Sequence, residues 1–287
     1  MNTILSSKQV AEILGVNESS VKRWADSGML SCYKTPGGHR KFKKDDLLLF
    51  SSKYSFELKS DINNNSSEKN HLNNFNFKIT NDLLFKKLMV GSEDDLTDFL
   101  YSLHLSGISV IDIYDNVIAK IMFDIGDKWK RKELTVDQEH IATNKIIKSI
   151  IRLHDKIASE PYKGLTALCG SLEGEFHELP LLSVRNVLDY YGWKVIYVGA
   201  NTPLKAMQSS ISKYKPDIVC LSSTIVKKKE SFISDIRKLY AVSKSSGSKL
   251  LVGGSGINDI ENISIKADAE IKSTGQLIKF LKSNFPF

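Results

Sequence analysis

The sequence predicts a chain of several domains, α-helical in its middle and α/β towards its end. Helical periodicity without a proline runs from Phe77 to about Glu160. From Pro161 onward, short β-branched apolar runs alternate with helical patterns, which is typical of a parallel sheet covered by helices. A stretch rich in Ser, Asn and Lys precedes both parts. We therefore expect a winged helix-turn-helix domain over 1–50, a flexible linker over 51–76, a four-helix bundle over 77–160 and a flavodoxin-like (Rossmann-like) parallel-sheet domain over 161–287.

Composition excludes several other classes of protein. The chain has 287 residues, of which 41% are hydrophobic, enough for more than one core. No stretch approaches about 18 uncharged apolar residues, the length that a membrane-spanning helix needs. The first residues lack the basic start and apolar core of a signal peptide. The three cysteines, Cys32, Cys169 and Cys220, lie in strand-like runs with no disulfide or zinc spacing. We expect a cytoplasmic protein with buried, reduced thiols.

The N-terminal segment predicts two short helices followed by a hairpin. Ser6-x-x-Gln9 is a capping box at the start of the first helix, which Gly15 ends. Asn17 can cap a second helix, over 18–27. The hairpin arms are expected at 30–34 and 40–43, around the turn Thr35-Pro36-Gly37-Gly38, and a short helix at 45–50.

This N-terminal segment has the shape and charge of a DNA-binding domain. Seven Lys or Arg residues lie between positions 21 and 44, against one acidic residue. Two short helices and a basic hairpin fit a major groove and its adjacent phosphates. The alternative is a small protein-interaction module with a solvated basic face. The side chains expected to contact DNA are Ser19, Ser20, Lys22, Arg23, His39, Arg40 and Lys41.

The helical region predicts four helices, over 79–89, 93–104, 109–130 and 136–158. Trp129 ends the third of them. Thr135-x-x-Gln138 is a capping box, so Glu139 and His140 lie in the first turns of the fourth. A helical hairpin therefore brings Trp129 and the Glu139–His140 pair to one end of the bundle. The alternative for Trp129 is a core anchor of the bundle.

In the last region, three polar elements follow three predicted strands. Strands are expected at 165–172, 194–198, 217–221, 249–252 and 270–272. After the first, third and fourth of these come Glu175-Phe176-His177, Ser222-Ser223-Thr224 and Gly253-Gly254. The carboxyl ends of parallel strands are where open sheets bind ligands. A metal ligand, hydroxyl groups and close backbone approach suit a flat cofactor. The alternative is a solvated loop histidine on an ordinary flavodoxin-like domain.

These three polar elements resemble the cobalamin-binding domain of methionine synthase and its relatives, which has the pattern Asp/Glu-x-His-x-x-Gly, Ser-x-Leu/Thr and Gly-Gly. The resemblance implies that His177 is the lower axial ligand of cobalt and that Glu175 holds its tautomer. Ser222, in the motif that ends at Thr224, would hydrogen-bond the buried nucleotide tail of the cofactor. Gly253 and Gly254 would let that tail pass. Pro180 stands where the family has glycine, a departure that suits the first turn of a helix.

The other two regions extend the resemblance. Residues 9–42 resemble the MerR-family DNA-binding domain, and Trp-x9-Glu-His resembles the cap of the CarH/LitR light-responsive repressors, which combine all three modules in this order. By this resemblance, Trp129 would pack against the upper cobalt substituent. Glu139 and His140 would contact its adenosyl group, and Gly126 would leave room for close approach. Some members have a histidine directly after the tryptophan, where this chain has Lys130.

The resemblance implies a transcriptional repressor without enzymatic activity. It would bind adenosylcobalamin or methylcobalamin, assemble as a homodimer or homotetramer on double-stranded operator DNA in the dark, and leave the DNA after illumination. Two alternatives stay open. One is a corrinoid protein that carries methyl groups, and the other is a MerR-like regulator with a degenerate pocket and no cobalamin.

Overall fold

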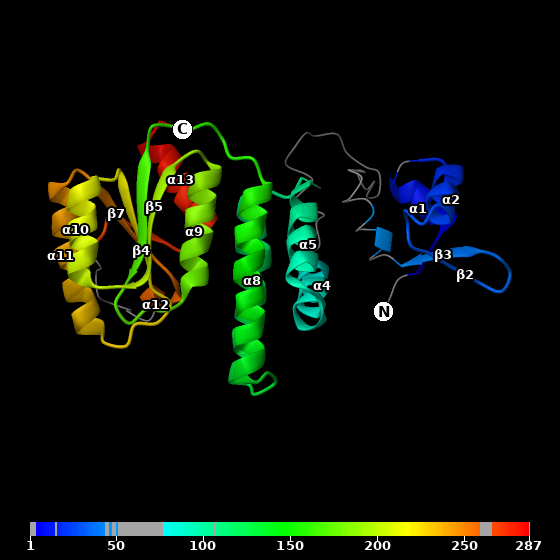
Figure 1. The fold of residues 1–287 in the computed structure, drawn as a ribbon, viewed down its shortest axis with the longest axis horizontal. Helices are drawn as coiled ribbons and strands as arrows, with labels where there is room; N and C mark the ends of the chain where they lie inside the picture. Colours follow the sequence, from blue (N-terminus) through cyan, green and yellow to red (C-terminus); the bar gives the residue numbers. More distant parts are fainter. Residues whose placement is uncertain are drawn as a thin grey trace. The chain divides into compact units, whose positions relative to one another are not determined.

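The computed structural model describes residues 4–14, 16–43, 46–47, 50, 77–105, 107–258 and 266–286 (Figure 1). The chain divides into two compact units, Met1–Ser109 and Val110–Phe287. The predicted linker, 51–76, and the predicted helix end at Gly15 lie outside the described residues. In the part of the chain that is described, no helix is both long enough and apolar enough to cross a membrane.

The N-terminal domain is a helix-turn-helix with a three-stranded antiparallel sheet. Its elements are β1 (Ile4–Ser6), α1 (Ser7–Leu14), α2 (Glu18–Asp26), β2 (Tyr33–Lys34) and β3 (Arg40–Lys43), with strand order β1-β3-β2. The predicted capping box is present, since the Ser6 amide donates to Gln9 Oε1 at 2.9 Å and the Gln9 amide donates to Ser6 Oγ at 3.3 Å. A tight turn joins β2 to β3, and the Gly38 amide donates to the Thr35 carbonyl at 2.8 Å with Gly38 at φ 78°.

Two details of this domain differ from the sequence prediction, and a third agrees with it. Strand β1 was not predicted, and it forms because Leu5 pairs with Phe42 across the sheet and both side chains are buried. Asn17 lies at the N-cap of α2, but its side chain accepts no capping hydrogen bond. Of the predicted short helix at 45–50, the described residues are helical, and Leu47 and Phe50 are buried in the domain core.

The four predicted helices are present to within about two residues at each end. In the first unit they are α4 (Phe77–Val90) and α5 (Glu93–Leu105), and in the second unit α8 (Val136–Lys156) is the fourth. The third comprises α6 (Val110–Asp112), a π-helical segment η2 (Ile113–Ile118) and α7 (Ala119–Lys130). Because the boundary between the units falls between α5 and α6, the packing of all four as one bundle stays a prediction.

The second unit contains a five-stranded parallel sheet. Its strands are β4 (Thr166–Leu172), β5 (Lys194–Thr202), β6 (Ile218–Ser222), β7 (Lys249–Gly253) and β8 (Ala269–Ile271), in the order β5-β4-β6-β7-β8. This order is that of a flavodoxin-like domain and confirms the predicted fold. Figure 1 shows α9 (Glu178–Tyr190) and α13 (Thr274–Asn284) on one face, and α10 (Leu204–Tyr214) and α11 (Lys229–Ser245) on the other. A short helix, α12 (Ser255–Asn258), follows β7.

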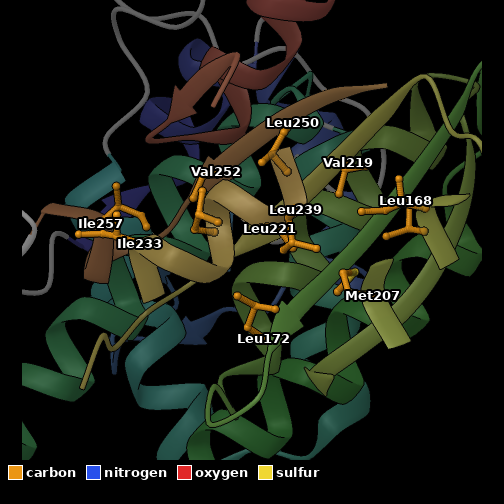
Figure 2. Close-up of a cluster of buried hydrophobic side chains, with 12 residues drawn as sticks. Leu168, Leu172, Met207, Val219, Leu221, Ile233, Leu239, Leu250, Val252 and Ile257 are labelled. Atoms are coloured by element: carbon orange, nitrogen blue, oxygen red, sulfur yellow. The ribbon is translucent and has the colours of Figure 1, made fainter. Parts of the chain in front are cut away.

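One buried hydrophobic cluster of this unit lies between the sheet and helices α10 and α11 (Figure 2). Leu168, Val219 and Leu250, one from each central strand, have no exposed surface. Full burial of such a side chain contributes about 1.5–3 kcal/mol to folding. The central strands read as continuous apolar runs because helices cover both faces of the sheet. The rigid sheet that results holds the loops at its carboxyl edge.

Candidate functional site

The predicted Glu175 and His177 meet at the carboxyl edge of the sheet, between β4 and α9. His177 is the N-cap residue of α9, and its Nδ1 lies 2.5 Å from Glu175 Oε1. The His177 amide donates to the same oxygen at 2.8 Å. An ionised carboxylate can only accept, so Nδ1 carries the proton and the lone pair lies on Nε2. The His177 side chain is 47% exposed, so an imidazole of fixed tautomer faces outward.

Glu175 also joins this loop to the next strand. The side chain is only 5% exposed, and its Oε2 accepts from the amides of Thr224 at 2.5 Å and Ile225 at 3.0 Å. Burial raises the pKa of the Glu175 carboxyl, but hydrogen bonds from Ile225, His177 and Thr224 outweigh it and hold the pKa below its usual range. The ends of β4 and β6 are therefore fixed around one buried anion.

The residues present fit a cobalt-containing macrocycle. Thr224 Oγ1 is buried without a hydrogen-bond partner, and Ser222, two residues before it, is buried as well. Unpaired buried hydroxyls are costly, so a polar ligand group at this point would relieve the cost. Nowhere in the described residues do three or more His, Cys, Asp or Glu side chains gather as a metal site. A single imidazole is sufficient for a metal that a macrocyclic ring already coordinates.

Gly253 and Gly254 are required by the sheet edge itself. A Cβ at Gly253 would lie 2.4 Å from the carbonyl oxygen of Ile271, and one at Gly254 would lie 2.2 Å from that of Ser223. Gly254 also has φ 105°, a conformation that residues with a side chain rarely adopt. The backbone at these two glycines thus lies close to neighbouring strand ends. Their contact with a cofactor tail stays a prediction.

Pro180 is accommodated as the sequence predicts. It is the third residue of α9, where backbone N–H groups have no acceptor within the helix. The missing N–H of proline therefore breaks no helical hydrogen bond. The departure from the family's glycine does not disturb the fold around His177.

The residues predicted to cover the cofactor lie at the end of α7 and the start of α8. The capping box of α8 is present, and the Thr135 amide donates to Gln138 Oε1 at 3.0 Å. Glu139 accepts from Thr143 Oγ1 at 2.8 Å and lies 3.4 Å from His140 Nε2. Trp129 is 45% exposed at the end of α7, so it is not a core anchor of the described unit. Figure 1 shows this end of α8 towards the end of the unit where the strands of the sheet finish.

A clasp that sequence analysis did not predict joins the π-helical segment to the α/β domain. Asp115 Oδ1 accepts from the amide and the hydroxyl of Thr274, and Oδ2 accepts from the Gly275 amide, all at 2.9 Å. Nearby, Asn186 Nδ2 on α9 donates to the Tyr114 hydroxyl at 2.9 Å and to the Ile150 carbonyl at 3.2 Å. No local pattern signals these contacts, because the partners are up to 160 residues apart.

The DNA-binding candidates are arranged in two groups. On α2, Lys22 and Arg23 are exposed, Lys22 pairs with Glu18 at 2.9 Å, and Arg23 donates to Ser20 Oγ at 3.4 Å. Ser19 of that helix and His39 of the hairpin are exposed, and Lys41 is half-buried.

Arg40 is engaged within the domain. Its guanidinium donates to both carboxylate oxygens of Asp26, with Nη2 at 2.6 Å from Oδ1 and 2.7 Å from Oδ2. This contact raises the pKa of Arg40 and lowers that of Asp26. The pair fixes the hairpin to the end of α2, a role that the sequence did not indicate. Contacts of these residues with DNA stay predictions.

Three family models match the chain. A helix-turn-helix domain matches residues 4–51, a B12 binding domain matches 165–273, and a second B12 binding domain model matches 81–153. Together they follow the order predicted from the sequence. The parallel sheet is therefore a B12-binding domain, and the helices before it belong to a helical B12-binding domain.

Several curated proteins are similar to the chain. The HTH-type transcriptional repressors CarH and CarA of Myxococcus xanthus are 24% and 31% identical over 135 and 126 residues, 47% and 44% of this chain. The chain spans less than half the length of each, 44% and 43%. The trimethylamine corrinoid protein of Methanosarcina barkeri is 22% identical over 204 residues, 69% of this chain and 93% of that protein.

A solved structure supports the fold. The monomethylamine corrinoid protein of Methanosarcina barkeri superposes with a TM-score of 0.60 at 16% identity, over 72% of this chain and 99% of that one. At this identity the likeness bears on the fold alone. With a helix-turn-helix domain before them, the chain has the domain content of a CarH-type cobalamin-binding regulator.

Proposed function

We propose that this protein is a transcriptional repressor of the MerR type whose binding to operator DNA depends on adenosylcobalamin and on light. One observation carries the proposal: a helix-turn-helix domain and a B12-binding domain with a hydrogen-bonded Glu175–His177 pair occur in the same chain. The similarity to CarH and CarA supports a role in repression. Such a protein acts by binding and release and needs no catalytic group.

In this proposal each residue of the site has a defined task. His177 offers Nε2 to cobalt, and Glu175 keeps the proton on Nδ1. Ser222 and Thr224 offer hydroxyls to the nucleotide tail of the cofactor, and Gly253 and Gly254 allow that tail to lie close to the strand ends. Trp129, Glu139 and His140 would contact the group carried by the cobalt. When bound, adenosylcobalamin supplies a cobalt–carbon bond that light breaks.

The switch requires a change that the DNA-binding domain can sense. A single helix-turn-helix domain reads one half-site, so tight repression needs at least two copies of the chain. We infer that the B12-binding regions self-associate, as a dimer or tetramer, when the cofactor fixes Trp129 and its neighbours. If these contacts were released after illumination, the population would shift to a weaker-binding species.

A methyl-carrying corrinoid protein is the second candidate. It is favoured by the similarity to the trimethylamine corrinoid protein, which extends over 93% of that protein. The helix-turn-helix domain at residues 4–51 has no task in such a carrier. DNA binding separates the two candidates, because a carrier needs none.

The deciding experiment is a gel shift on the gene's own promoter, with adenosylcobalamin, in the dark and after illumination. We expect retardation in the dark that light abolishes, together with a smaller species in light scattering. The His177→Ala variant should bind the corrin more weakly, with a spectrum that lacks the histidine-ligated form. Retardation that ignores both cofactor and light would refute the switch and leave a cobalamin-independent regulator.

A further inference from the structure

The positive charge of the chain is concentrated outside the helix-turn-helix domain. Residues 203–258, which contain α10 and α11, hold ten Lys or Arg residues against three acidic ones, a net charge of +7. The whole chain also has a net charge of +7. The helical region 77–160, by contrast, holds twelve basic and fourteen acidic residues. Part of this charge lies on α10 and α11, whose exposed positions hold six basic residues and one acidic residue.

The charge is exposed, and part of it has no acidic partner. Lys205, Lys213 and Lys215 on and after α10, and Arg237 on α11, are all exposed. Among the described residues, Lys205, Lys215 and Arg237 form no ion pair. Of the three acidic residues of the segment, Asp217 accepts from the Thr166 amide, and Asp235 pairs with Lys238 of the same helix.

The rest of this surface is small and polar. The exposed positions of α10 and α11 comprise six basic residues, one acid, one tyrosine and seven Ser or Ala residues, namely Ala206, Ser209, Ser212, Ser231, Ser234, Ala241 and Ser245. Small side chains between cations let a rigid polyanion approach closely, and serine hydroxyls can donate to phosphate oxygens. A surface that only kept the protein soluble would not need such an excess of one sign of charge.

A surface of this charge suits a polyanion, and helix α8 does not obstruct it. Helices α10 and α11 cover the face of the sheet opposite α9, and α8 packs on α9 (Figure 1). The basic face is thus directed away from α8 and from the clasp at Asp115. A ligand there would not compete with cobalamin at the carboxyl edge.

We propose that the α10–α11 face is a second DNA-binding surface, which contacts the phosphate backbone of duplex DNA without sequence preference. The proposal rests on the proposed DNA-binding function, because the helix-turn-helix domain supplies the DNA. A second surface on the same chain then binds at high effective concentration. Phosphate contacts of this kind add affinity and salt dependence but no sequence information.

The test measures binding of the full chain to a random-sequence duplex of about 40 base pairs, by fluorescence anisotropy at several salt concentrations. The variant is the triple change Lys205→Gln, Lys213→Gln, Arg237→Gln. The matched control removes three exposed lysines from other surfaces: Lys120→Gln, Lys194→Gln, Lys279→Gln. In the triple variant, the fall of log affinity with log salt should be less steep by about 2–3 in slope, since each lost phosphate contact contributes about 0.9. The control should change the slope by no more than a third of that amount.

Each outcome decides between the proposals. A triple variant with wild-type affinity and slope overturns the second surface, whereas failure of the wild type to bind any duplex overturns the proposed DNA-binding function instead. A control that loses as much as the triple variant shows a general effect of net charge and also overturns the surface. Vesicles with anionic phospholipids form the last arm: if the triple variant loses vesicle binding but keeps DNA binding, the surface belongs to a membrane.

Discussion

Asp115 offers the sharpest test of how the helical region is held on the α/β domain. The first three N–H groups of α13 have no acceptor within the helix. Ser273 Oγ accepts from the Gln276 amide, and Asp115 accepts from those of Thr274 and Gly275. A residue about 160 positions away thus completes the cap of the C-terminal helix. Replacing it by alanine leaves two amides and one hydroxyl without their acceptor.

The cost can be estimated from capping energetics. Removing an N-cap side chain costs about 0.5–2 kcal/mol, and a carboxylate near a helix N-terminus contributes about 0.3–1 kcal/mol more through the helix dipole. Because Asp115 serves two amides, we expect Asp115→Ala to lose about 2–3 kcal/mol of local stability. Asp115→Asn keeps one acceptor oxygen and should lose less.

Hydrogen exchange measured by mass spectrometry reads this loss where it occurs. A loss of about 2–3 kcal/mol corresponds to about 30- to 150-fold faster opening of α13. Asp124→Ala, a change of an exposed carboxylate on α7, is the matched control and should leave α13 unaffected. Wild-type protection of α13 in Asp115→Ala would show that the clasp does not stabilise the helix, and the reasoning would fail.

Three further predictions follow from the sites. Because the folded-state pKa of Glu175 is low, its stabilising contribution is present above the unfolded-state pKa of about 4.3 and is lost as pH falls through the folded-state pKa. In Glu175→Gln, hydrogen exchange in the loop at 222–226 should therefore depend less on acid pH than in the wild type. Equal dependence in both proteins would contradict an ionised Glu175. Nothing lies within 4 Å of a Cβ placed at Gly126, so Gly126→Ala should stabilise α7 by about 0.5–1 kcal/mol, seen in exchange, yet weaken corrin binding in a spectral titration; unchanged corrin affinity would remove Gly126 from the site. If Arg40 acts by holding the hairpin against Asp26, Asp26→Ala should weaken DNA binding in anisotropy; stronger binding would indicate that the freed Arg40 contacts phosphate directly.

The elements and their order could be read from the sequence because they depend on local patterns. Alternating apolar runs and capping signals such as Ser6–Gln9 and Thr135–Gln138 act over a few residues, so the helices and strands fell where they were expected. The rule that ligands meet the carboxyl ends of parallel strands predicts that His177 and Thr224 lie at the same edge of the sheet, and the amides of both residues donate to Glu175 there. Strand β1 escaped prediction because it is short and stabilised by its pairing with β3.

What only the tertiary structure decided are the contacts between distant segments. Asp115 completing the cap of α13, Arg40 binding Asp26, and Glu175 accepting from Thr224 and Ile225 leave no trace in local composition. Such partners are chosen by the packing of whole elements, since a carboxylate can accept from any donor that the fold brings within reach. The sequence by itself determined the modules and the ligand-bearing edge; the fold decided which side chains hold those modules in place.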